Sequence, residues 1–458
     1  SSARMISQVV ATARTAFESG KTRPLAWRKA QLVAMIKMLR DNADDFSAAL
    51  KQDLGRGLEE AWLYDIGFSI TEIELIIKNL KKWTEPRKVS TPLVSLPGSS
   101  HRIPQPLGVV LVIAPWNYPI QLLMIPVAGA IAAGNAVVMK PSEVSSATSA
   151  LLGKLVPQYF DNDAIAIVEG AVPETTQLLA EKFDHIFYTG NGTVGRVVMR
   201  AAAENLTPVT LELGGKSPTI VDKSANIAIA GRRIAWAKYV NAGQTCVAPD
   251  YVLAHADIAD KLVDEIRKSV KDFYGADPQS SGDFARISSP RHFSRLKAML
   301  TSGKVAIGGE TDEQQRYIAP TVLVDVQASD SVMQEEIFGP ILPMLTVDSI
   351  DEAISFVNAR PHPLALYVFA EDQKVNDKVV ASTTSGGVTV NGTIFHMTGP
   401  FLPFGGVGES GMGAYHGRAG VDTFQHLKPV LKRSTRVDAP LAYPPYTKRK
   451  FAILKKFI

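Results

Sequence analysis

The chain has a single cysteine, Cys246, in 458 residues. One thiol can form neither an intramolecular disulfide nor a thiolate metal cluster, so a disulfide-stapled fold and a cysteine-based metal site are excluded. A chain without disulfides fits a reducing compartment, and we expect a cytoplasmic protein. A lone cysteine is often only a small buried hydrophobic residue, and composition alone favours that interpretation of Cys246 over a nucleophile.

A strong excess of either charge is also missing. The chain carries 49 basic and 45 acidic residues, a net charge of +4, spread along its length. A nucleic-acid-binding protein concentrates basic residues on one surface, so we expect no nucleic-acid partner. The eight histidines show no i, i+4 pairing, and no metal site is predicted.

Long apolar runs are absent as well. The N-terminus has no continuous apolar segment of the kind that a signal peptide needs. The most apolar run, 122–134, is interrupted by Pro126, which favours a buried helix over a membrane span. At 458 residues the chain exceeds what one hydrophobic core usually serves, so a soluble protein of two or three domains is expected.

What is present is a helical start followed by an α/β pattern. Apolar residues at Leu32, Met35, Ile36 and Leu39 repeat with helical spacing. Five prolines in 84–108 predict a loop or an extended edge strand. Apolar runs without polar alternation then occur between helical stretches, which predicts a doubly wound α/β fold with parallel strands buried on both faces, continuing to about residue 390. These runs are Val109–Ile113, Ala136–Met139, Ala164–Val168, His185–Tyr188, Val209–Leu211 and Thr219–Val221.

A glycine motif follows one of these strands. Gly190-Asn-Gly-Thr-Val-Gly195 matches G-x-G-x-x-G and precedes a helical run, 196–206. Glu212 lies where the ribose-binding acid of a dinucleotide fingerprint would be expected. However, the motif comes late in the α/β region, and Glu212 closes a strand directly before two glycines. We therefore expect its carboxylate at the carboxyl edge of the sheet, where reacting groups lie. The alternative is a helix cap or a partner for Lys216.

Seven short motifs occur in order along the chain: Pro115-Trp-Asn-Tyr-Pro119, Lys140-Pro-Ser-Glu143, Tyr188-Thr-Gly190, Leu211-Glu-Leu-Gly-Gly-Lys-Ser-Pro218, Gly243-Gln-Thr-Cys246, Glu335-Glu-Ile-Phe-Gly-Pro340 and Pro403-Phe-Gly-Gly406. With them the chain resembles the NAD(P)-dependent aldehyde dehydrogenase superfamily over roughly residues 5 to 430. Two details, Val247-Ala-Pro-Asp-Tyr251 and Gly411-Met-Gly-Ala-Tyr-His-Gly417, resemble its class 3 branch, which includes fatty aldehyde dehydrogenases.

The resemblance implies a chemistry for three residues. Cys246 would attack the aldehyde carbon as a thiolate and give a thiohemiacetal. The Asn117 side-chain amide and the Cys246 backbone N–H would stabilise the oxyanion. Loss of hydride to the cofactor leaves a thioester, and Glu212 would activate the water that hydrolyses it.

The resemblance also implies a cofactor, NAD or NADP. Lys140 and Glu143 would contact the adenosine ribose, Glu336 the nicotinamide ribose and Phe338 the ring. The other implied contacts are Trp116, Gly170, Thr189, Gly190, Asn191, Gly192, Thr193, Val194, Gly195 and Leu213. Glu143 should repel a 2′-phosphate and Lys140 should attract one, so the choice between NAD and NADP stays open.

Simpler interpretations of the same residues remain. The sequence around Lys140 and Glu143 also suits a helix start with Pro141 in its first turn. Glu335 and Glu336 can be two solvated acids before a buried Phe338.

The family fold would divide the chain into four parts. A Rossmann-like cofactor domain comprises residues 1–83 and 106–211, and an α/β catalytic domain comprises 212–395. A small β oligomerisation element, 84–105 and 420–435, implies a homodimer. The amphipathic tail, 440–458, carries five basic residues, with Phe451, Leu454, Phe457 and Ile458 at roughly helical spacing. It either lies peripherally on an anionic membrane or docks on its own subunit, or it is disordered.

We therefore expect an enzyme that oxidises an apolar, medium- to long-chain or aromatic aldehyde to the carboxylic acid. Two alternatives stay open. A related enzyme would release the acyl group to coenzyme A, although such relatives usually lack the glutamate that matches Glu212. The chain could also be a non-catalytic structural or binding protein on the same fold.

Overall fold

The computed structural model describes residues 2–457, which separate into two compact units. Unit 1 contains the chain up to Trp83 together with Pro106–Gln425, and unit 2 contains Thr84–Gln105 and the residues from His426 onward. Unit 1 is built on two largely parallel sheets, and unit 2 on one small antiparallel sheet.

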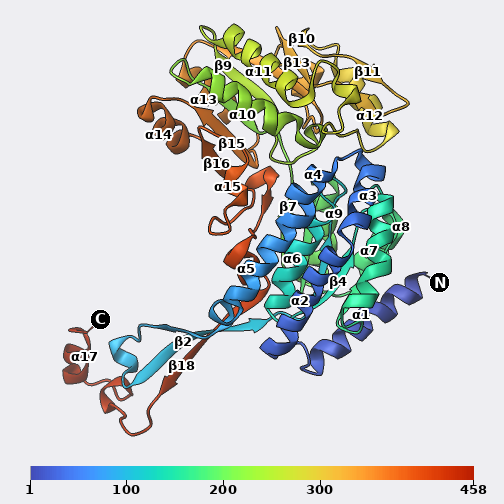
Figure 1. Cartoon of the computed structure of the whole chain (residues 1–458). Coiled ribbons are helices and arrows are strands. Elements are labelled where there is room, and N and C mark those ends of the chain that lie inside the picture. The colour runs from blue at the N-terminus through green and yellow to red at the C-terminus, as the bar shows by residue number, and fades with distance from the viewer. Residues whose placement is uncertain (1, 458) are drawn as a thin grey trace. The chain divides into compact units, whose positions relative to one another are not determined.

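The N-terminal helices of unit 1 follow the predicted pattern. They are α1 (Ser2–Glu18), α2 (Leu25–Asp41), α3 (Ala43–Leu54), α4 (Leu58–Ala61), the π-helical turn η1 (Trp62–Ile66) and α5 (Gly67–Thr84) (Figure 1). On α2 the apolar positions Leu32, Met35 and Leu39 are fully buried, because their spacing puts them on one face. The prediction of a helical start is confirmed.

The first sheet has the strand order β17-β7-β6-β3-β4-β5, with only the short β17 antiparallel. Its strands are β3 (Val109–Ile113), β4 (Ala136–Lys140), β5 (Ile165–Ile167), β6 (His185–Thr189), β7 (Val209–Glu212) and β17 (Gly411–Met412). The order reverses between β3 and β6, which is the switch point of a doubly wound sheet. Five of the predicted runs form these parallel strands, because a run that is apolar throughout suits a strand covered on both faces.

Helices cover both faces of this sheet. They are α6 (Gln121–Ala132), α7 (Ser146–Tyr159), α8 (Val172–Ala180), α9 (Gly192–Ala203) and α16 (Gly417–Asp422). Right-handed crossovers put α6 and α7 on one face and α9 on the other. The helices α2 and α16 pack on α6, and α1 packs on α8. Every residue of α6 is buried although Pro126 interrupts it, as the sequence predicted.

The second sheet has the order β10-β13-β14-β9-β8-β15-β16, parallel except for β10. Its strands are β8 (Pro218–Val221), β9 (Tyr251–His255), β10 (Lys304–Ile307), β13 (Thr321–Val324), β14 (Ile341–Val347), β15 (Ala365–Phe369) and β16 (Gly387–Val390). Figure 1 shows it surrounded by α10 (Ile227–Tyr239), α11 (Ala259–Tyr274), α13 (Ile350–Asn358) and α14 (Gln373–Ser382), with α12 (Pro290–Met299) at one end. The α/β pattern therefore continues to residue 390, as expected. The short elements are β11 (Thr311–Asp312), β12 (Tyr317–Ile318) and α15 (Phe395–Thr398).

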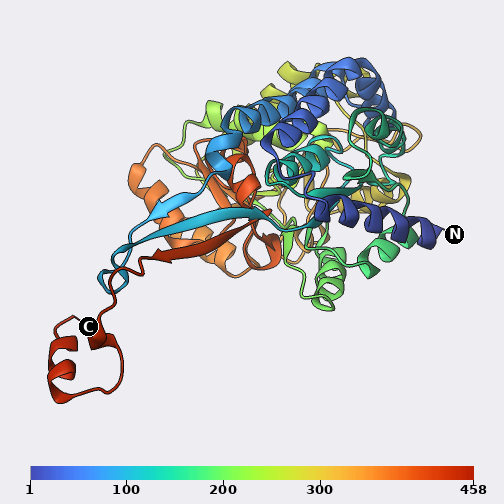
Figure 2. The ribbon, with the colours of Figure 1, turned by 90° about the horizontal axis from the view of Figure 1, so that it is seen from below.

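Unit 2 is a three-stranded sheet of β1 (Arg87–Val89), β2 (Gly98–Pro106) and β18 (Gln425–Arg433), in the order β1-β2-β18. Figure 2 shows β2 and β18 running side by side. The prediction of a loop or edge strand is wrong for β2, which is the central strand. Its pairing with β1 ends at Arg102, so Pro104 and Pro106 interrupt no ladder bond on that side.

The tail of unit 2 contains the short 3-10 helix η7 (Pro440–Ala442) and one α-helix, α17 (Lys448–Leu454). The helical spacing predicted for the tail therefore ends at Leu454, with Phe457 in the turn that follows. Ile458 lies outside the described residues. Within residues 2–457, no helix is both long and apolar enough to cross a membrane.

Candidate active site

One edge of the first sheet gathers four of the predicted site residues. Asn117 follows β3, Lys140 ends β4, Thr189 ends β6 and Glu212 ends β7. Since these strands are parallel, their carboxyl ends meet at the same edge of the sheet. Ligands of doubly wound sheets bind outside this edge, at the point where the strand order reverses.

The second sheet contributes the opposite wall with the amino ends of its strands. Lys216 precedes β8, Cys246 precedes β9 and Phe338 precedes β14. Residues from both sheets line one cleft of about 1390 Å³. A cleft of this size exceeds the range of about 300–1,000 Å³ usual for small ligands and suits a dinucleotide with a substrate beside it.

Most of the predicted residues meet in this cleft. Its lining includes Asn117, Cys246, Trp116, Lys140, Glu143, Thr189, Gly190, Asn191, Gly192, Thr193, Val194, Leu213, Glu336 and Phe338. Gly170, Gly195 and Glu212 are not part of the lining. A Cβ on Gly195 would lie 2.9 Å from Leu213 Cδ2, so this glycine serves the close packing of α9. Gly170 has a φ of 134° and lies against the Glu174 side chain.

The segment before Cys246 has an unusual backbone. Asn241 and Ala242 have φ values of 53° and 51°, and Gly243 has a φ of 77°. Left-handed residues other than glycine cost free energy and occur where the surroundings hold them. A Cβ on Gly243 would lie 2.1 Å from the Gly339 carbonyl oxygen, so only glycine fits at this position. The cysteine therefore follows a turn that is held by its neighbours.

Cys246 is half-buried, and burial raises the pKa of its thiol above the usual range. The carboxylates of Glu336 and Glu212 raise the pKa further, whereas a hydrogen bond with the Asn117 side chain lowers it. The thiol form is thus favoured, and a nearby base is needed to generate the thiolate. The Asn117 amide also donates to the Gln244 carbonyl at 3.2 Å, which leaves its second hydrogen for another acceptor.

Glu212 is 3% exposed, and neither carboxylate oxygen has a hydrogen-bond partner within the part of the chain that the structure describes. Burial raises its pKa well above the usual value. A buried unpaired carboxyl group is costly, so its environment indicates a chemical task. Lys216 binds Asp250 at 2.6 Å instead, so the interpretation of Glu212 as its partner is wrong.

Lys140 and Glu143 lie at the end of β4. The Lys140 ammonium is buried, donates to the Pro141 carbonyl and lies 3.9 Å from a Glu143 carboxylate oxygen. Burial lowers the pKa of Lys140. The next helix, α7, begins only at Ser146, so the interpretation of Pro141 as the first turn of a helix is wrong.

Glu336 and Phe338 lie in the wall of the cleft, in the segment before β14. Glu336 accepts a hydrogen bond from the Gly215 N–H at 3.0 Å, and burial raises its pKa to about 8. A Cβ on Gly214 would lie 2.2 Å from a Glu336 oxygen, so the two segments approach closely. Phe338 meets Trp116 edge-on, with ring centroids 5.4 Å apart. Glu336 is therefore not a solvated acid, whereas Glu335 is exposed.

Two residues of α12 were not predicted. The His292 ring nitrogen Nε2 lies 2.7 Å from the Phe338 carbonyl oxygen, and Arg295 donates to the Glu336 carbonyl at 3.2 Å. Burial lowers the pKa of His292 to about 4, so the ring is neutral and donates through Nε2–H. His292 and Arg295 thus hold the Glu336–Phe338 segment in place. No signal in the sequence distinguishes them from other residues of an amphipathic helix.

The backbone N–H donors and the glycines that line the cleft suit the predicted cofactor. The N-terminus of α9 opens into it, with Asn191 as N-cap accepting from Val194 N–H at 2.9 Å. Free backbone N–H groups at such a terminus bind anionic phosphates. Among residues 2–457, no group of three or more His, Cys, Asp or Glu side chains is placed to hold a metal ion.

Comparisons with known proteins identify the family. Residues 1–430 match the model of the "Aldehyde dehydrogenase family". The chain is 52% identical to a mouse (Mus musculus) "Aldehyde dehydrogenase, dimeric NADP-preferring", covering 96% of this chain and 98% of the relative. It is 49% identical to mouse "Aldehyde dehydrogenase family 3 member A2", covering 97% and 92% of the two chains.

Solved structures give the same result. The substrate-bound state of Staphylococcus aureus AldH superposes with a TM-score of 0.97 at 44% identity, covering 99% of both chains. A P. syringae indole-3-acetaldehyde dehydrogenase mutant in complex with NAD+ and IAA has a TM-score of 0.86 at 25% identity, covering 94% of this chain and 89% of that chain.

Proposed function

The chain belongs to the aldehyde dehydrogenase family, and we propose that Cys246, Asn117 and Glu212 carry out its reaction. The protein is an NAD(P)-dependent enzyme that oxidises aldehydes. One observation supports the assignment above all. The Glu212 carboxylate is buried and unpaired at the end of β7, and the Asn117 amide is bound to the carbonyl of Gln244, two residues before Cys246, in the cleft that Asn117 and Cys246 both line.

The first step is attack of Cys246 sulfur on the aldehyde carbon. Since the thiol pKa is raised, the proton must pass to a base, and Glu212 with its own raised pKa is suited to accept it. The carbonyl oxygen becomes negative as the C–S bond forms. The second hydrogen of the Asn117 amide and the Cys246 N–H stabilise it, and one such donor typically contributes about 3 kcal/mol.

When bound, NAD or NADP would supply the hydride acceptor that the oxidation requires. The residues that would hold the nicotinamide ring are Trp116 and Phe338, whose rings pack edge-on, together with Glu336. Lys140 and Glu143, which also line the cleft, would contact the adenosine ribose. The task of these side chains is orientation, because hydride transfer depends steeply on distance and angle.

The last step is hydrolysis of the Cys246 thioester. Glu212 first releases the proton from Cys246 to solvent and then takes a proton from water, and the hydroxide oxygen bonds to the acyl carbon. As the C–S bond breaks, Glu212 returns this proton to the sulfur, which releases the carboxylic acid and restores the thiol. The buried, unpaired state of Glu212 supports water rather than coenzyme A as the acyl acceptor, since thiolysis needs no such base.

The assignment is tested by following reduced cofactor at 340 nm with wild type and Cys246→Ala. Wild type should form reduced cofactor and the variant none, while both bind the cofactor alike. Acyl-CoA formed in place of free acid when coenzyme A is added would contradict the hydrolytic step.

We infer an apolar substrate, medium- to long-chain or aromatic. Aromatic side chains line the cleft beside Cys246, among them Tyr188, which lies near enough for the charge of Cys246 to affect its pKa. An aromatic lining favours apolar ligands. A panel of hexanal, decanal, benzaldehyde, acetaldehyde and a charged semialdehyde tests this. Highest kcat/KM for acetaldehyde or the semialdehyde would contradict it.

We also propose a homodimer formed through unit 2. The strands β1 and β18 are the edges of its sheet, and exposed edges pair readily with another chain. Val89 and Leu431, one on each edge strand, are exposed. The mouse relative is named as dimeric. Light scattering should give twice the mass of the chain for wild type and a monomer for a Val89→Lys/Leu431→Lys variant.

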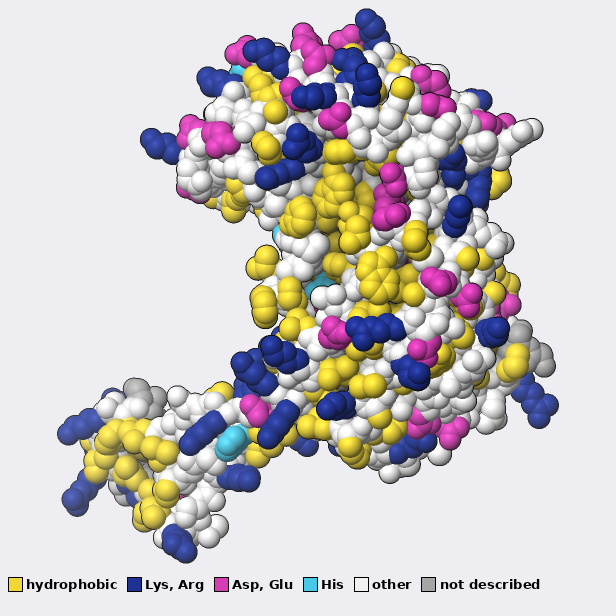
Figure 3. Space-filling model, viewed as in Figure 1, with side chains coloured by type: hydrophobic (Ala, Val, Ile, Leu, Met, Phe, Trp, Pro, Cys, Tyr) yellow, Lys and Arg dark blue, Asp and Glu magenta, His cyan; other side chains and the backbone are white. Residues whose placement is uncertain are grey.

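The tail supports a peripheral membrane contact. Phe451 and Phe457 are exposed, and no acidic residue occurs in 440–458. Figure 3 shows apolar side chains with Lys and Arg around them over this segment. Such a surface binds anionic lipid through apolar area and charge together. Full-length protein should float with anionic liposomes, and a chain truncated at Pro445 should not. Equal flotation would contradict the proposal.

A further inference from the structure

We propose that Arg56, paired with Asp65, is a positioning residue for the reaction at Cys246. Its guanidinium holds together the two segments that carry the oxyanion donors, the loop after β3 and the turn before Cys246. The inference rests on the proposed roles of Asn117 and Cys246. Arg56 and Asp65 lie between α3 and α5, and their side chains are 0% exposed.

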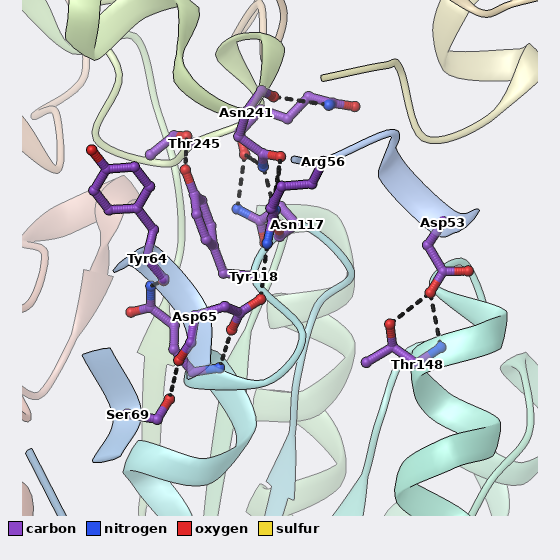
Figure 4. A network of polar contacts seen from close by, with 12 residues as sticks. Asp53, Arg56, Tyr64, Asp65, Ser69, Asn117, Tyr118, Thr148, Asn241 and Thr245 are labelled. Carbon is purple, nitrogen blue, oxygen red and sulfur yellow. Dashed lines mark hydrogen bonds and ion pairs between the residues drawn. The ribbon is translucent and has the colours of Figure 1, made fainter. Parts of the chain in front are cut away.

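The guanidinium has an acceptor for each of its edges. Arg56 Nη1 binds Asp65 Oδ2 at 2.9 Å. Nη2 donates to the Asn117 backbone carbonyl and to Asn241 Oδ1, the latter at 2.7 Å. Nε also reaches Asn241 Oδ1, at 3.2 Å. Figure 4 shows the three partners around the side chain. One cation thus joins a helical segment, the Asn117 loop and the turn before the cysteine.

Asn241 extends this link to the cysteine. Its side-chain Nδ2 donates to the Asn117 carbonyl and to the Gln244 carbonyl, each at 3.0 Å. Asn241 itself has a φ of 53°, which is an unfavourable conformation unless other contacts hold it. The Arg56–Asn241 bonds supply those contacts. The position of Gln244, two residues before Cys246, therefore depends on a guanidinium nearly two hundred residues earlier.

A second route passes through Tyr118. The Arg56 guanidinium lies over the Tyr118 ring, 4.7 Å from its centroid. The Tyr118 hydroxyl bonds to Thr245 Oγ1 at 2.9 Å, directly before Cys246. The Arg56 side chain therefore holds both segments beside the oxyanion site, the loop after β3 and the turn before Cys246.

Asp65 is itself held in place. It belongs to the π-helical turn η1, and its Oδ1 accepts the Gln121 N–H. Such turns are rare and occur often at functional sites. A buried ion pair is weak evidence for stability, because apolar residues of the same volume often serve as well. The planar guanidinium of Arg56 instead fixes the directions of its hydrogen bonds, which a lysine ammonium cannot do.

Arg56→Lys tests the proposal, with Arg28→Lys as the matched control. Arg28 is also a buried arginine, but it donates to the Ala132 carbonyl on α6, away from the cleft. For both variants we would measure the melting temperature, the Kd of the cofactor, kcat and KM for the aldehyde, and the alkylation rate of Cys246.

Both variants should lose some thermal stability and keep cofactor affinity. Arg56→Lys alone should lower kcat, by about 10²-fold if the oxyanion donors are displaced, and change the pH dependence of Cys246 alkylation. If kcat falls no further in Arg56→Lys than in Arg28→Lys, the positioning role is wrong.

Asn241→Ala keeps the measurement possible if Arg56→Lys fails to fold. It retains the Arg56–Asp65 ion pair but removes the link to the cysteine turn, and it should lower kcat in the same way; an unchanged kcat would overturn the proposal. Asn117→Ala tests the proposed oxyanion site separately from the role of Arg56. If it leaves kcat intact, the proposed oxyanion site is wrong, independently of what Arg56 does.

Discussion

The Asn117 side-chain amide donates to the Gln244 carbonyl at 3.2 Å and so ties the loop after β3 to the chain two residues before Cys246. This bond joins the two halves of unit 1, since Asn117 follows a strand of the first sheet and Gln244 precedes a strand of the second. The amide is thereby oriented before any substrate arrives, and electrostatic stabilisation is most effective from groups that are already oriented.

Removing this amide should slow the reaction without unfolding the protein. Asn117→Ala loses one oxyanion donor, so kcat should fall by about 10²-fold while cofactor affinity stays unchanged. Steady-state kinetics at saturating cofactor, with the melting temperature as a check on folding, measures this. A rise in KM with kcat unchanged would show that Asn117 binds substrate instead.

Glu212→Gln should separate the two halves of the reaction. The amide cannot take a proton from water, so the thioester should accumulate on Cys246. Because the amide also cannot accept the Cys246 proton, rapid mixing should show a burst of reduced cofactor that is slower than in wild type, followed by an almost absent steady state. A steady-state rate equal to that of wild type would contradict the role of Glu212.

The wild-type hydrolysis rate should rise with pH. Burial holds the pKa of Glu212 well above its usual value, so the carboxyl group is protonated at low pH and becomes a base only as pH increases. The hydrolysis rate from single-turnover experiments between pH 6 and pH 9 measures this. A flat profile would show that another group activates the water.

Gly243→Ala should destabilise the protein more than Gly20→Ala does. Both glycines have positive φ, 77° and 83°, so both variants bear the backbone cost of about 1 kcal/mol. Only Gly243 would also place a Cβ 2.1 Å from the Gly339 carbonyl oxygen, whereas Gly20 has open space around it. Denaturant unfolding gives the two free energies. Equal losses would mean that the chain near Gly339 shifts without cost.

Glu143→Gln should move the cofactor preference towards NADP. Its carboxylate lies 3.9 Å from Lys140 Nζ and is partly exposed, so loss of the negative charge should weaken repulsion of a 2′-phosphate by about 1 kcal/mol, roughly fivefold. The ratio of kcat/KM for NADP and NAD measures the effect. Glu204→Gln, an exposed acid outside the cleft lining, is the control.

His185 should make stability fall in acid. Burial lowers its pKa from 6.5 to about 4, so between these values the unfolded chain binds a proton that the folded chain does not. Stability is therefore lost as pH falls from 6.5 towards 4, by about 2 kcal/mol at pH 4.5. Unfolding of wild type and His185→Gln at pH 7.5 and 4.5 should show a steeper loss for wild type. Parallel losses would contradict the assignment.

The sequence by itself determined the local elements and the chemistry. The run Val109–Ile113 is apolar at every position, and only a strand covered on both faces suits such a run. The motifs around Asn117, Glu212 and Cys246 indicated the family, because each needs its residue types for a reaction step. Local patterns contain this information, since burial and chemistry leave their trace in neighbouring residues.

Only the tertiary structure decided what those elements meet. No local pattern shows that β2 lies between β1 and β18, that His292 holds Phe338, or that Lys216 binds Asp250 and leaves Glu212 unpaired. The same is true of Arg56, whose sequence neighbours are unremarkable. Such contacts join residues far apart in the chain, and their geometry follows from the packing of the two sheets, which hydrophobic periodicity does not encode.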